Sequence, residues 1–114
     1  MNDLAAATIH TALRGLSARQ RVIADNVANV ETPGFRAGRI DFEASLAAAL
    51  GDGAPSATTV SASLSTAGTL PNGNNVSLDQ EIVSLTDTNL RYQLMVEAMN
   101  AKYRLLRTAM GTNR

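Results

Sequence analysis

One stretch decides the fold: residues 77–111, which read SLDQEIVSLTDTNLRYQLMVEAMNAKYRLLRTAMG. Steps of four and three residues, alternating from Leu78, meet apolar side chains for more than four heptads. This spacing predicts one long helix whose seam packs against another helix, with Ser77 and Gln80 as a capping box and Gly111 just past its end. The seam residues are Leu78, Ile82, Leu85, Asn89, Tyr92, Val96, Met99, Tyr103, Leu106 and Met110.

A second apolar face runs along the opposite side of this predicted helix. A helix that is apolar on two opposite faces requires two layers of neighbours. We therefore expect the second face to contact neighbouring subunits. Its large members are Val83, Leu90, Leu94 and Leu105, with Ala98 and Ala101 between them.

The N-terminal stretch from Asn2 to Val30 has the same spacing. Asn2 or Asp3 can cap the start of the predicted helix, and Thr32 before Pro33 ends it near Val30. Gln20 and Asn89 are the only polar seam members, and they either fix the register of the two helices or face a solvated gap. The N-terminal seam consists of Ile9, Leu13, Leu16, Gln20, Ile23, Val27 and Val30.

The middle of the chain is predicted to hold an extended connector, a short helix and a flexible loop. Residues 35–40 are predicted to form an extended connector, after which Asp41 can cap a short helix that ends at Gly51. Phe42, Leu46 and Leu50 give this short helix its apolar face. Residues 51–76 are rich in Gly, Ser, Thr, Ala and Asn, which predicts a flexible loop with weak extended structure around Thr58 to Leu64.

Together these elements predict an all-α fold. Two long helices form an antiparallel coiled-coil-like hairpin, with an inserted irregular and extended middle segment and one short helix. Residues 1–31 and 77–111 would make one discontinuous helical domain, 32–76 the inserted segment, and 112–114 a tail. Partial burial of one seam does not offset the entropy of ordering about 60 helical residues, so we expect the monomer to become ordered on assembly. Contacts between unlike faces build rings or filaments.

Composition narrows the function. Ten basic and ten acidic side chains balance at zero, so no net field attracts nucleic acid. Cys is absent, His10 is the only histidine and lacks carboxylates at ligand spacing, and no nucleotide-binding or nucleophile motif occurs. We therefore expect no enzyme, catalytic residue, metal or cofactor. No membrane-spanning run or secretory signal pattern is present, so we expect neither direct membrane insertion nor a cleavable signal peptide.

The turn after the first helix carries a recognisable pattern. Asn26-Val-Ala-Asn-Val-Glu-Thr-Pro-Gly-Phe35 resembles the Asn-x-Ala-Asn-x-x-Thr-Pro-Gly-(Tyr/Phe) signature of the flagellar basal-body rod and hook family. Residues 39–42, 90–93 and 102–110 extend the resemblance and place it nearest to the proximal rod members. Physically, the two Asn can bond local backbone, Pro stops the helix and Gly allows positive φ, so these are structural or interface residues. The turn motif consists of Asn26, Asn29, Thr32, Pro33, Gly34 and Phe35.

The resemblance implies a non-enzymatic structural subunit. Such a subunit assembles helically with copies of itself and other rod proteins, meets basal-body ring and junction proteins, and connects the membrane ring to the distal rod and hook to transmit torque. It reaches the periplasmic rod through the flagellar type III export apparatus. Phe42 and Leu46 also look like an export-gate docking element, although anchoring the short helix explains them slightly better. The alternative function is a coiled-coil adaptor or export chaperone that binds partner helices.

Overall fold

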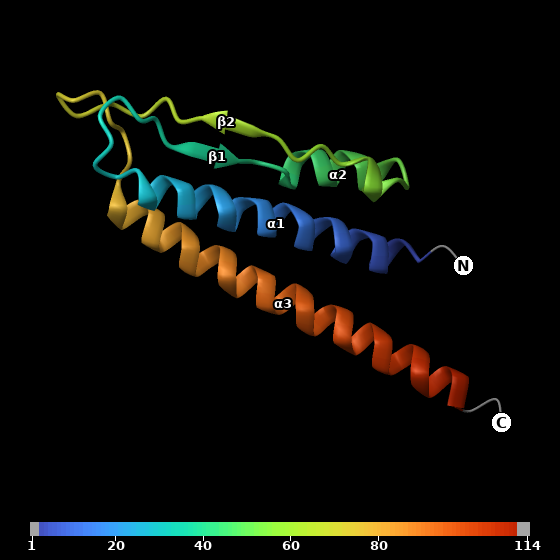
Figure 1. The fold of residues 1–114 in the computed structure, drawn as a ribbon. Helices are drawn as coiled ribbons and strands as arrows, with labels where there is room; N and C mark the ends of the chain where they lie inside the picture. Colours follow the sequence, from blue (N-terminus) through green and yellow to red (C-terminus); the bar gives the residue numbers. More distant parts are fainter. Residues whose placement is uncertain (1–2, 112–114) are drawn as a thin grey trace.

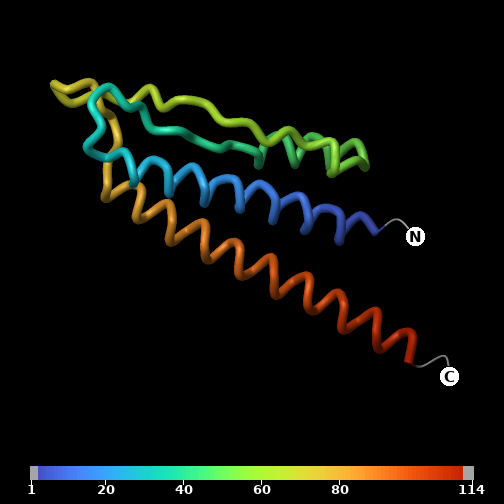
Figure 2. The backbone as a smooth tube through the Cα atoms, in the orientation of Figure 1, coloured from blue at the N-terminus to red at the C-terminus, as the bar shows by residue number. Residues whose placement is uncertain are grey.

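The computed structural model describes residues 3–111 of the 114-residue chain. Its molecule is elongated, with extents of 68 × 26 × 14 Å, and has three layers in which α1 lies between α3 and the middle segment (Figure 1). Figure 2 shows the path: the chain runs along α1, doubles back twice through the middle segment, and returns to begin α3 beside the end of α1. The elements are α1 (Leu4–Ala28), β1 (Gly38–Ile40), α2 (Glu43–Gly51), the 3-10 helix η1 (Pro55–Ala57), β2 (Ala62–Leu64) and α3 (Leu78–Gly111).

The ends of α1 follow from local side chains. Asp3 is the N-cap, and its Oδ1 accepts a hydrogen bond from the Ala6 N–H at 3.1 Å. At the other end the Asn29 side chain donates to the Asp25 carbonyl at 2.8 Å, so the helix ends at Ala28, two residues before the expected Val30. The other candidate cap, Asn2, lies outside the described residues, as does the expected tail at 112–114.

The long helix α3 begins as the sequence predicts. Ser77 precedes it, and the Ser77 hydroxyl lies 3.4 Å from the Gln80 N–H that it caps. Asp79 and Glu81 in the first turn face the positive end of the helix dipole. Gly111 belongs to the helix instead of following it, which lengthens α3 by one residue.

The all-α prediction needs a correction in the middle segment. β1 and β2 pair in antiparallel fashion, with Gly38 opposite Leu64 and Ile40 opposite Ala62. The expected connector and the expected weakly extended stretch thus satisfy each other's backbone groups. Helix α2 ends at Gly51 as predicted, but its N-cap is Phe42 and not Asp41.

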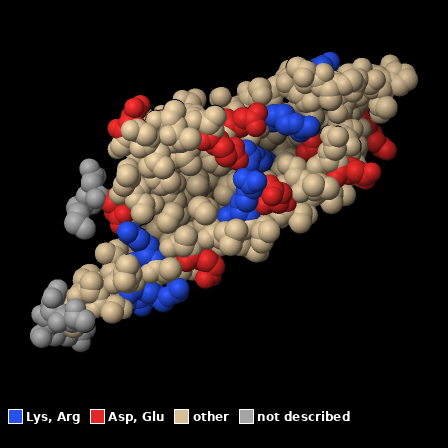
Figure 3. Space-filling view, turned by 180° about the vertical axis from the view of Figure 1, so that it is seen from behind, with Lys and Arg blue, Asp and Glu red and all other residues tan. Residues whose placement is uncertain are grey.

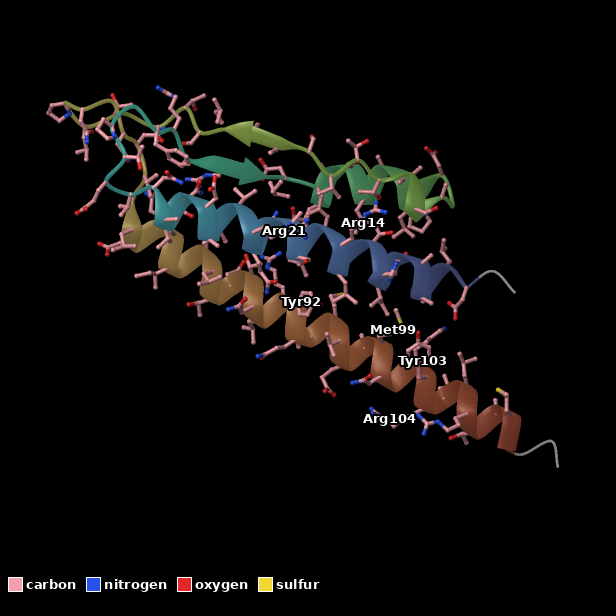
Figure 4. The ribbon with its side chains drawn as sticks, viewed as in Figure 1. Arg14, Arg21, Tyr92, Met99, Tyr103 and Arg104 are labelled. Atoms are coloured by element: carbon pink, nitrogen blue, oxygen red, sulfur yellow. The ribbon has the colours of Figure 1, made fainter. Side chains whose placement is uncertain are left out.

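The core lies between α1 and the middle segment. Ala12, Leu16, Ile40 and Phe42 form it, and the Phe42 ring fills the space beside Gly15, where an added Cβ would lie 2.5 Å from the ring. The expected flexible loop also packs here. Thr58 is buried, and its carbonyl accepts a hydrogen bond from Arg14 of α1 at 3.3 Å, with Arg14 labelled in Figure 4. The 51–76 segment therefore contains η1 and β2 and is held in place by α1 at Thr58 and by β1 along β2.

The face of α3 that meets α1 is rotated away from the predicted seam. Glu81 and Thr88 are the buried residues of α3, whereas the seam member Ile82 is 53% exposed. Tyr92 and Met99 do lie on the α1 side, as Figure 4 shows. On this rotated face Arg39 of β1 forms an ion pair with Glu81 at 3.0 Å.

Candidate functional site

The turn motif forms a clamp between α1 and the middle segment, and Asn26 is its centre. Asn26 is 1% exposed, its Nδ2 donates to the Gly38 carbonyl at 3.0 Å, and its Oδ1 accepts from the Gly38 N–H at 2.8 Å. Gly38 must be small at this contact, because an added Cβ would lie 2.9 Å from Val22. Both polar atoms of the amide are thus used to fasten β1 to the last turn of α1.

The remaining motif residues shape the turn itself. The Thr32 hydroxyl donates to the Asn29 side chain at 3.0 Å, which closes the chain after the helix. Gly34 has φ of 75°, a left-handed conformation that favours glycine, and its N–H donates to the Asn72 carbonyl at 2.8 Å. Pro33 is exposed, and Phe35 is half-buried. The structure places these residues in a hydrogen-bonded turn that is largely exposed, and it shows no ligand-shaped arrangement among them.

A second set of asparagines completes the clamp, and sequence reasoning missed it. The Asn74 side chain donates to the carbonyls of Asn29 and Thr32, at 2.9 and 2.8 Å, and accepts from the Val76 N–H at 2.7 Å. The Asn75 side chain accepts from the Ala37 N–H at 2.6 Å. Two adjacent asparagines, separated from the helix cap Ser77 by Val76 alone, were the available signal, since Asn side chains readily bond turn backbone.

Arg19 joins three elements at the other end of β1. Its guanidinium donates to both carboxylate oxygens of Glu43, at 2.9 and 2.7 Å, and to the Ile40 carbonyl at 3.0 and 2.7 Å, and it lies 5.1 Å from the centre of the Phe42 ring. These hydrogen bonds lower the pKa of Glu43 to about 2 and raise that of Arg19. Arg91 of α3 also approaches Glu43, at 3.8 Å. Figure 3, which views the molecule from behind, shows basic and acidic side chains lying next to one another across its middle.

The residues of the expected seam divide between the interface and the surface. On α1, Leu16 and Ile23 are buried, Ile9 and Leu13 half-buried, and Val27 is exposed. The two polar members meet, because the Gln20 side chain donates to that of Asn89 at 2.8 Å. On α3, the half-buried members are Tyr92, Val96 and Met99, and the exposed ones are Leu78, Ile82, Leu85, Asn89, Tyr103, Leu106 and Met110.

The expected inter-subunit face of α3 is uncovered in the single chain. Val83 and Leu105 are 69% and 66% exposed, and Leu90 and Leu94 are each 57% exposed. These four side chains lie along one side of a 34-residue helix. Isolated exposed apolar residues are ordinary, but a line of large ones on a single helix is typical of an interaction surface.

The two candidate export residues, Phe42 and Leu46, belong to the hydrophobic core or pack against it. Phe42 is 3% exposed, and Leu46 is half-buried against the same core. The folded chain therefore offers almost none of the Phe42 ring to a partner. Docking through this pair would require the segment around α2 to be unfolded.

Within residues 3–111 the structure holds no group of three or more His, Asp or Glu side chains placed to bind a metal ion. His10 lies exposed on α1. No helix in the same range is both long and apolar enough to cross a membrane.

Comparison with known proteins finds the same family that the turn motif resembles. A model of the family described as Flagella basal body rod protein matches residues 8–36. The flagellar basal body rod protein FlgB of Bacillus subtilis is 31% identical over 115 residues, covering 90% of this chain and 89% of that protein. FlgB of Yersinia enterocolitica is 33% identical over 96 residues, covering 66% and 70%, and FlgB of Borreliella burgdorferi is 32% identical over 108 residues, covering 75% and 80%.

The chain therefore belongs to the flagellar basal body rod protein family, and its role is structural and not enzymatic. Within that family its similarity is to FlgB, which confirms the resemblance to proximal rod members that its two ends suggest. Family membership also places the chain in the flagellar basal body.

Proposed function

We propose that this chain is a proximal rod subunit that packs helically with copies of itself and with other rod proteins through the outer face of α3. The observation that carries the proposal is the line of four uncovered apolar side chains, Val83, Leu90, Leu94 and Leu105. Full burial of a large aliphatic side chain contributes roughly 1.5–3 kcal/mol. Neighbouring helices that cover this face would gain several such contributions.

The shape of the subunit suits a rod that carries torque. Helix α3 has 34 residues, or about 51 Å at 1.5 Å per residue, and spans about three quarters of the 68 Å long dimension of the molecule. The turn clamp and Arg19 tie α1 and the middle segment to each other, which stiffens the subunit across its layers. In the assembled rod, such subunits connect the membrane ring to the distal rod and hook and contact ring and junction proteins.

The route to the rod is part of the same proposal. The subunit passes through the flagellar type III export apparatus without a cleavable signal and assembles in the periplasm. Phe42 and Leu46 dock at the export gate before the chain folds, and both join the core afterwards. Because Phe42 is 3% exposed and Leu46 half-buried in the folded chain, such docking has to precede folding.

Charging the outer face tests the assembly role. In a bacterium that carries this chain as its only copy of the subunit, Leu90→Glu with Leu94→Glu should abolish swimming and remove the subunit from isolated basal bodies. Both positions are exposed, so the purified variant should keep the circular dichroism spectrum of the parent.

Leu90→Met with Leu94→Met is the matched control, since it keeps both positions apolar and should leave assembly intact. Normal incorporation of the double Glu variant into basal bodies would overturn the proposed role of this face. If the parent instead purifies as a discrete soluble oligomer and never enters basal bodies, the chain is an adaptor.

A further inference from the structure

Helix α3 extends beyond the start of α1 at its C-terminal end (Figure 1). Lys102 forms an ion pair at 2.8 Å with Asp3, the N-cap of α1, so the residues after Lys102 have passed the start of α1. We name residues 103–111 the overhang; every one of them is exposed, and together they span about 13 Å. The overhang therefore lacks the neighbour that α1 provides for the preceding turns of α3.

The overhang continues the side of α3 that faces α1. Met99 lies on that side and is half-buried. Tyr103, Leu106 and Met110 stand four, seven and eleven residues after Met99, and a helix returns to nearly the same side at each of these steps. These three residues, which we name the free strip, are all exposed. The free strip is thus the uncovered continuation of the α1–α3 contact.

The free strip has a basic border. Residues 98–111 contain three basic and no acidic side chains. Arg107 stands four residues after Tyr103 and three before Met110, so it lies beside the free strip. No ion pair joins Arg107 to another side chain in the part of the chain that the structure describes. Arg104, in contrast, points away from α1 in Figure 4. The uncovered surface is therefore apolar with one positive edge.

We propose that the free strip binds a helix of a different basal-body protein, one whose apolar seam has acidic residues along its edge. This helix lies end to end with α1 and continues the α1–α3 pairing along the overhang. The partner is helical because apolar side chains at steps of four and three residues pack against a second helix. Its edge is acidic because Arg107 presents an unpaired positive charge beside the free strip.

The helices of this chain do not offer the required surface. Helix α1 carries three basic side chains and one acidic side chain, and Glu43, the acidic side chain of α2, is paired with α1. On α3, Glu81 is buried and Asp87 has an ion pair within its own helix. The other acidic residues of α3, Asp79 and Glu97, are about 27 Å apart along the helix, so they do not form one edge. The occupant is therefore a different protein and not a second copy.

The inference rests on the proposed rod function and adds to it the kind of partner that meets the C-terminal end of the subunit. The contact joins two different proteins, so it does not repeat from one copy of this chain to the next. Part of the attraction is between exposed charges, which salt screens, so the contact should weaken as ionic strength rises.

Two synthetic helical peptides test the contact on the purified full chain. Both peptides have Leu at the seam positions of several heptads; one has Glu along the edge of the seam, and the other has Lys at the same positions. Binding is measured by fluorescence anisotropy. The Glu peptide should bind at least tenfold more tightly than the Lys peptide, and Leu106→Ser with Met110→Ser should lower its affinity at least tenfold.

Charge reversal tests the basic border of the free strip. Arg107→Glu should reverse the preference, so that the Lys peptide binds at least tenfold more tightly than the Glu peptide. Arg104→Glu is the matched control, because the Arg104 side chain points away from α1, and it should keep the preference of the parent. All the substituted positions are exposed, so each variant should keep the circular dichroism spectrum of the parent.

A photo-reactive residue in place of Met110 checks the partner in isolated basal bodies. It should link to a protein other than this chain, and the linked peptide should have apolar residues at steps of four and three with acidic residues beside them. The same photo-reactive residue in place of Ser63, on the opposite layer, is the control and should not link to that peptide.

Two results would overturn the proposed contact. The first is a parent protein that shows no preference for the Glu peptide, and the second is linkage from position 110 to another copy of this chain, to a peptide without acidic residues, or to no protein. If either occurs while Leu90→Glu with Leu94→Glu still removes the subunit from basal bodies, the proposed rod function stands and only this contact fails. If the charged outer face is tolerated as well, both proposals fail.

Discussion

At the scale of single residues, amide side chains hold the turn together where apolar ones would be expected. Asn26 and Asn74 are almost fully buried, and every polar atom of their side chains has a backbone partner. An Asn side chain matches the donor and acceptor of a peptide group, so it can close an irregular turn that has no ladder of its own. The clamp therefore depends on the identity of these residues and not only on their size.

Removal of the Asn26 amide should destabilise the fold. Asn26→Ala leaves the N–H of Gly38 without a partner and leaves its carbonyl only the hydrogen bond that Arg39 donates at 3.2 Å, and an unsatisfied buried group costs about 1–3 kcal/mol. We expect the free energy of unfolding, measured with urea at pH 7, to fall by ~2 kcal/mol or more. Asn100→Ala, at an exposed position on α3, is the control and should change it little. A loss of less than ~0.5 kcal/mol for Asn26→Ala would contradict the importance of the clamp.

The ion pair of Glu43 with Arg19 should make stability depend on acid pH. The pKa of Glu43 is lowered from its usual 4.5 to about 2 in the folded chain. Because the folded value is the lower one, this stabilisation is fully present above pH 4.5 and is lost as the pH falls towards 2. Glu43 is partly exposed and screened by solvent, so we expect Glu43→Gln to cost only ~0.5–1 kcal/mol at pH 7.

The measurement is urea unfolding of the parent and the Glu43→Gln variant at several values between pH 7 and pH 2. The difference in stability between the two proteins should shrink across the lower part of that range. Glu97→Gln changes a carboxylate on the exposed surface of α3 and should show no such narrowing. A pH-independent difference for Glu43→Gln would refute the assignment.

At the scale of elements, α1 and α2 are joined by one aromatic ring. The Phe42 ring lies against Gly15 of α1 and beneath the Arg19 guanidinium, while Leu46 packs on the edge of the same core. A single side chain thus ends the extended segment, begins α2 and fills the core. That accounts for Phe42 at the N-cap position, where a polar residue is the usual choice.

The export proposal is tested by comparing two core residues of similar burial. Phe42→Ala and Leu16→Ala each empty part of the same core, and each should lower stability by about 2–5 kcal/mol. Of these two residues, only Phe42 belongs to the proposed docking element, so secretion into the periplasm, measured by immunoblot, should be blocked for Phe42→Ala and retained for Leu16→Ala. Equal secretion of the two variants would contradict the docking role and leave Phe42 with a role in the core only.

At the scale of the whole molecule, the long helices were predictable because their signals are local. The apolar spacing, the Asp3 and Ser77 caps and the Pro33 turn act within a few residues of where they stand, and the structure places both helices accordingly. The pairing of β1 with β2 was not predictable, since three-residue strands are too short to show a period.

The contacts between segments that are distant in sequence also could not be predicted from the sequence pattern. Glu81 is buried on α3 and forms an ion pair with Arg39, which comes from another element. Asn74 and Asn75 bond to backbone more than thirty residues away in sequence, at Asn29 and Ala37. Periodicity describes one helix at a time, so it located the apolar seam of α3 but missed the rotation that brings Glu81 and Thr88 inward.

Because α1 forms the middle layer, it separates a tip of the chain that can accept insertions from the face of α3 that is proposed to contact neighbouring subunits. The exposed tip at residues 66–72 lies on the far side of α1 from the outer face of α3, and the Asn74 clamp closes the chain again directly after it. Residues inserted at this tip would leave and re-enter the fold between fixed points, without touching the helix proposed to meet neighbouring subunits. A lineage can therefore lengthen or decorate the tip while its subunits continue to stack with the same partners.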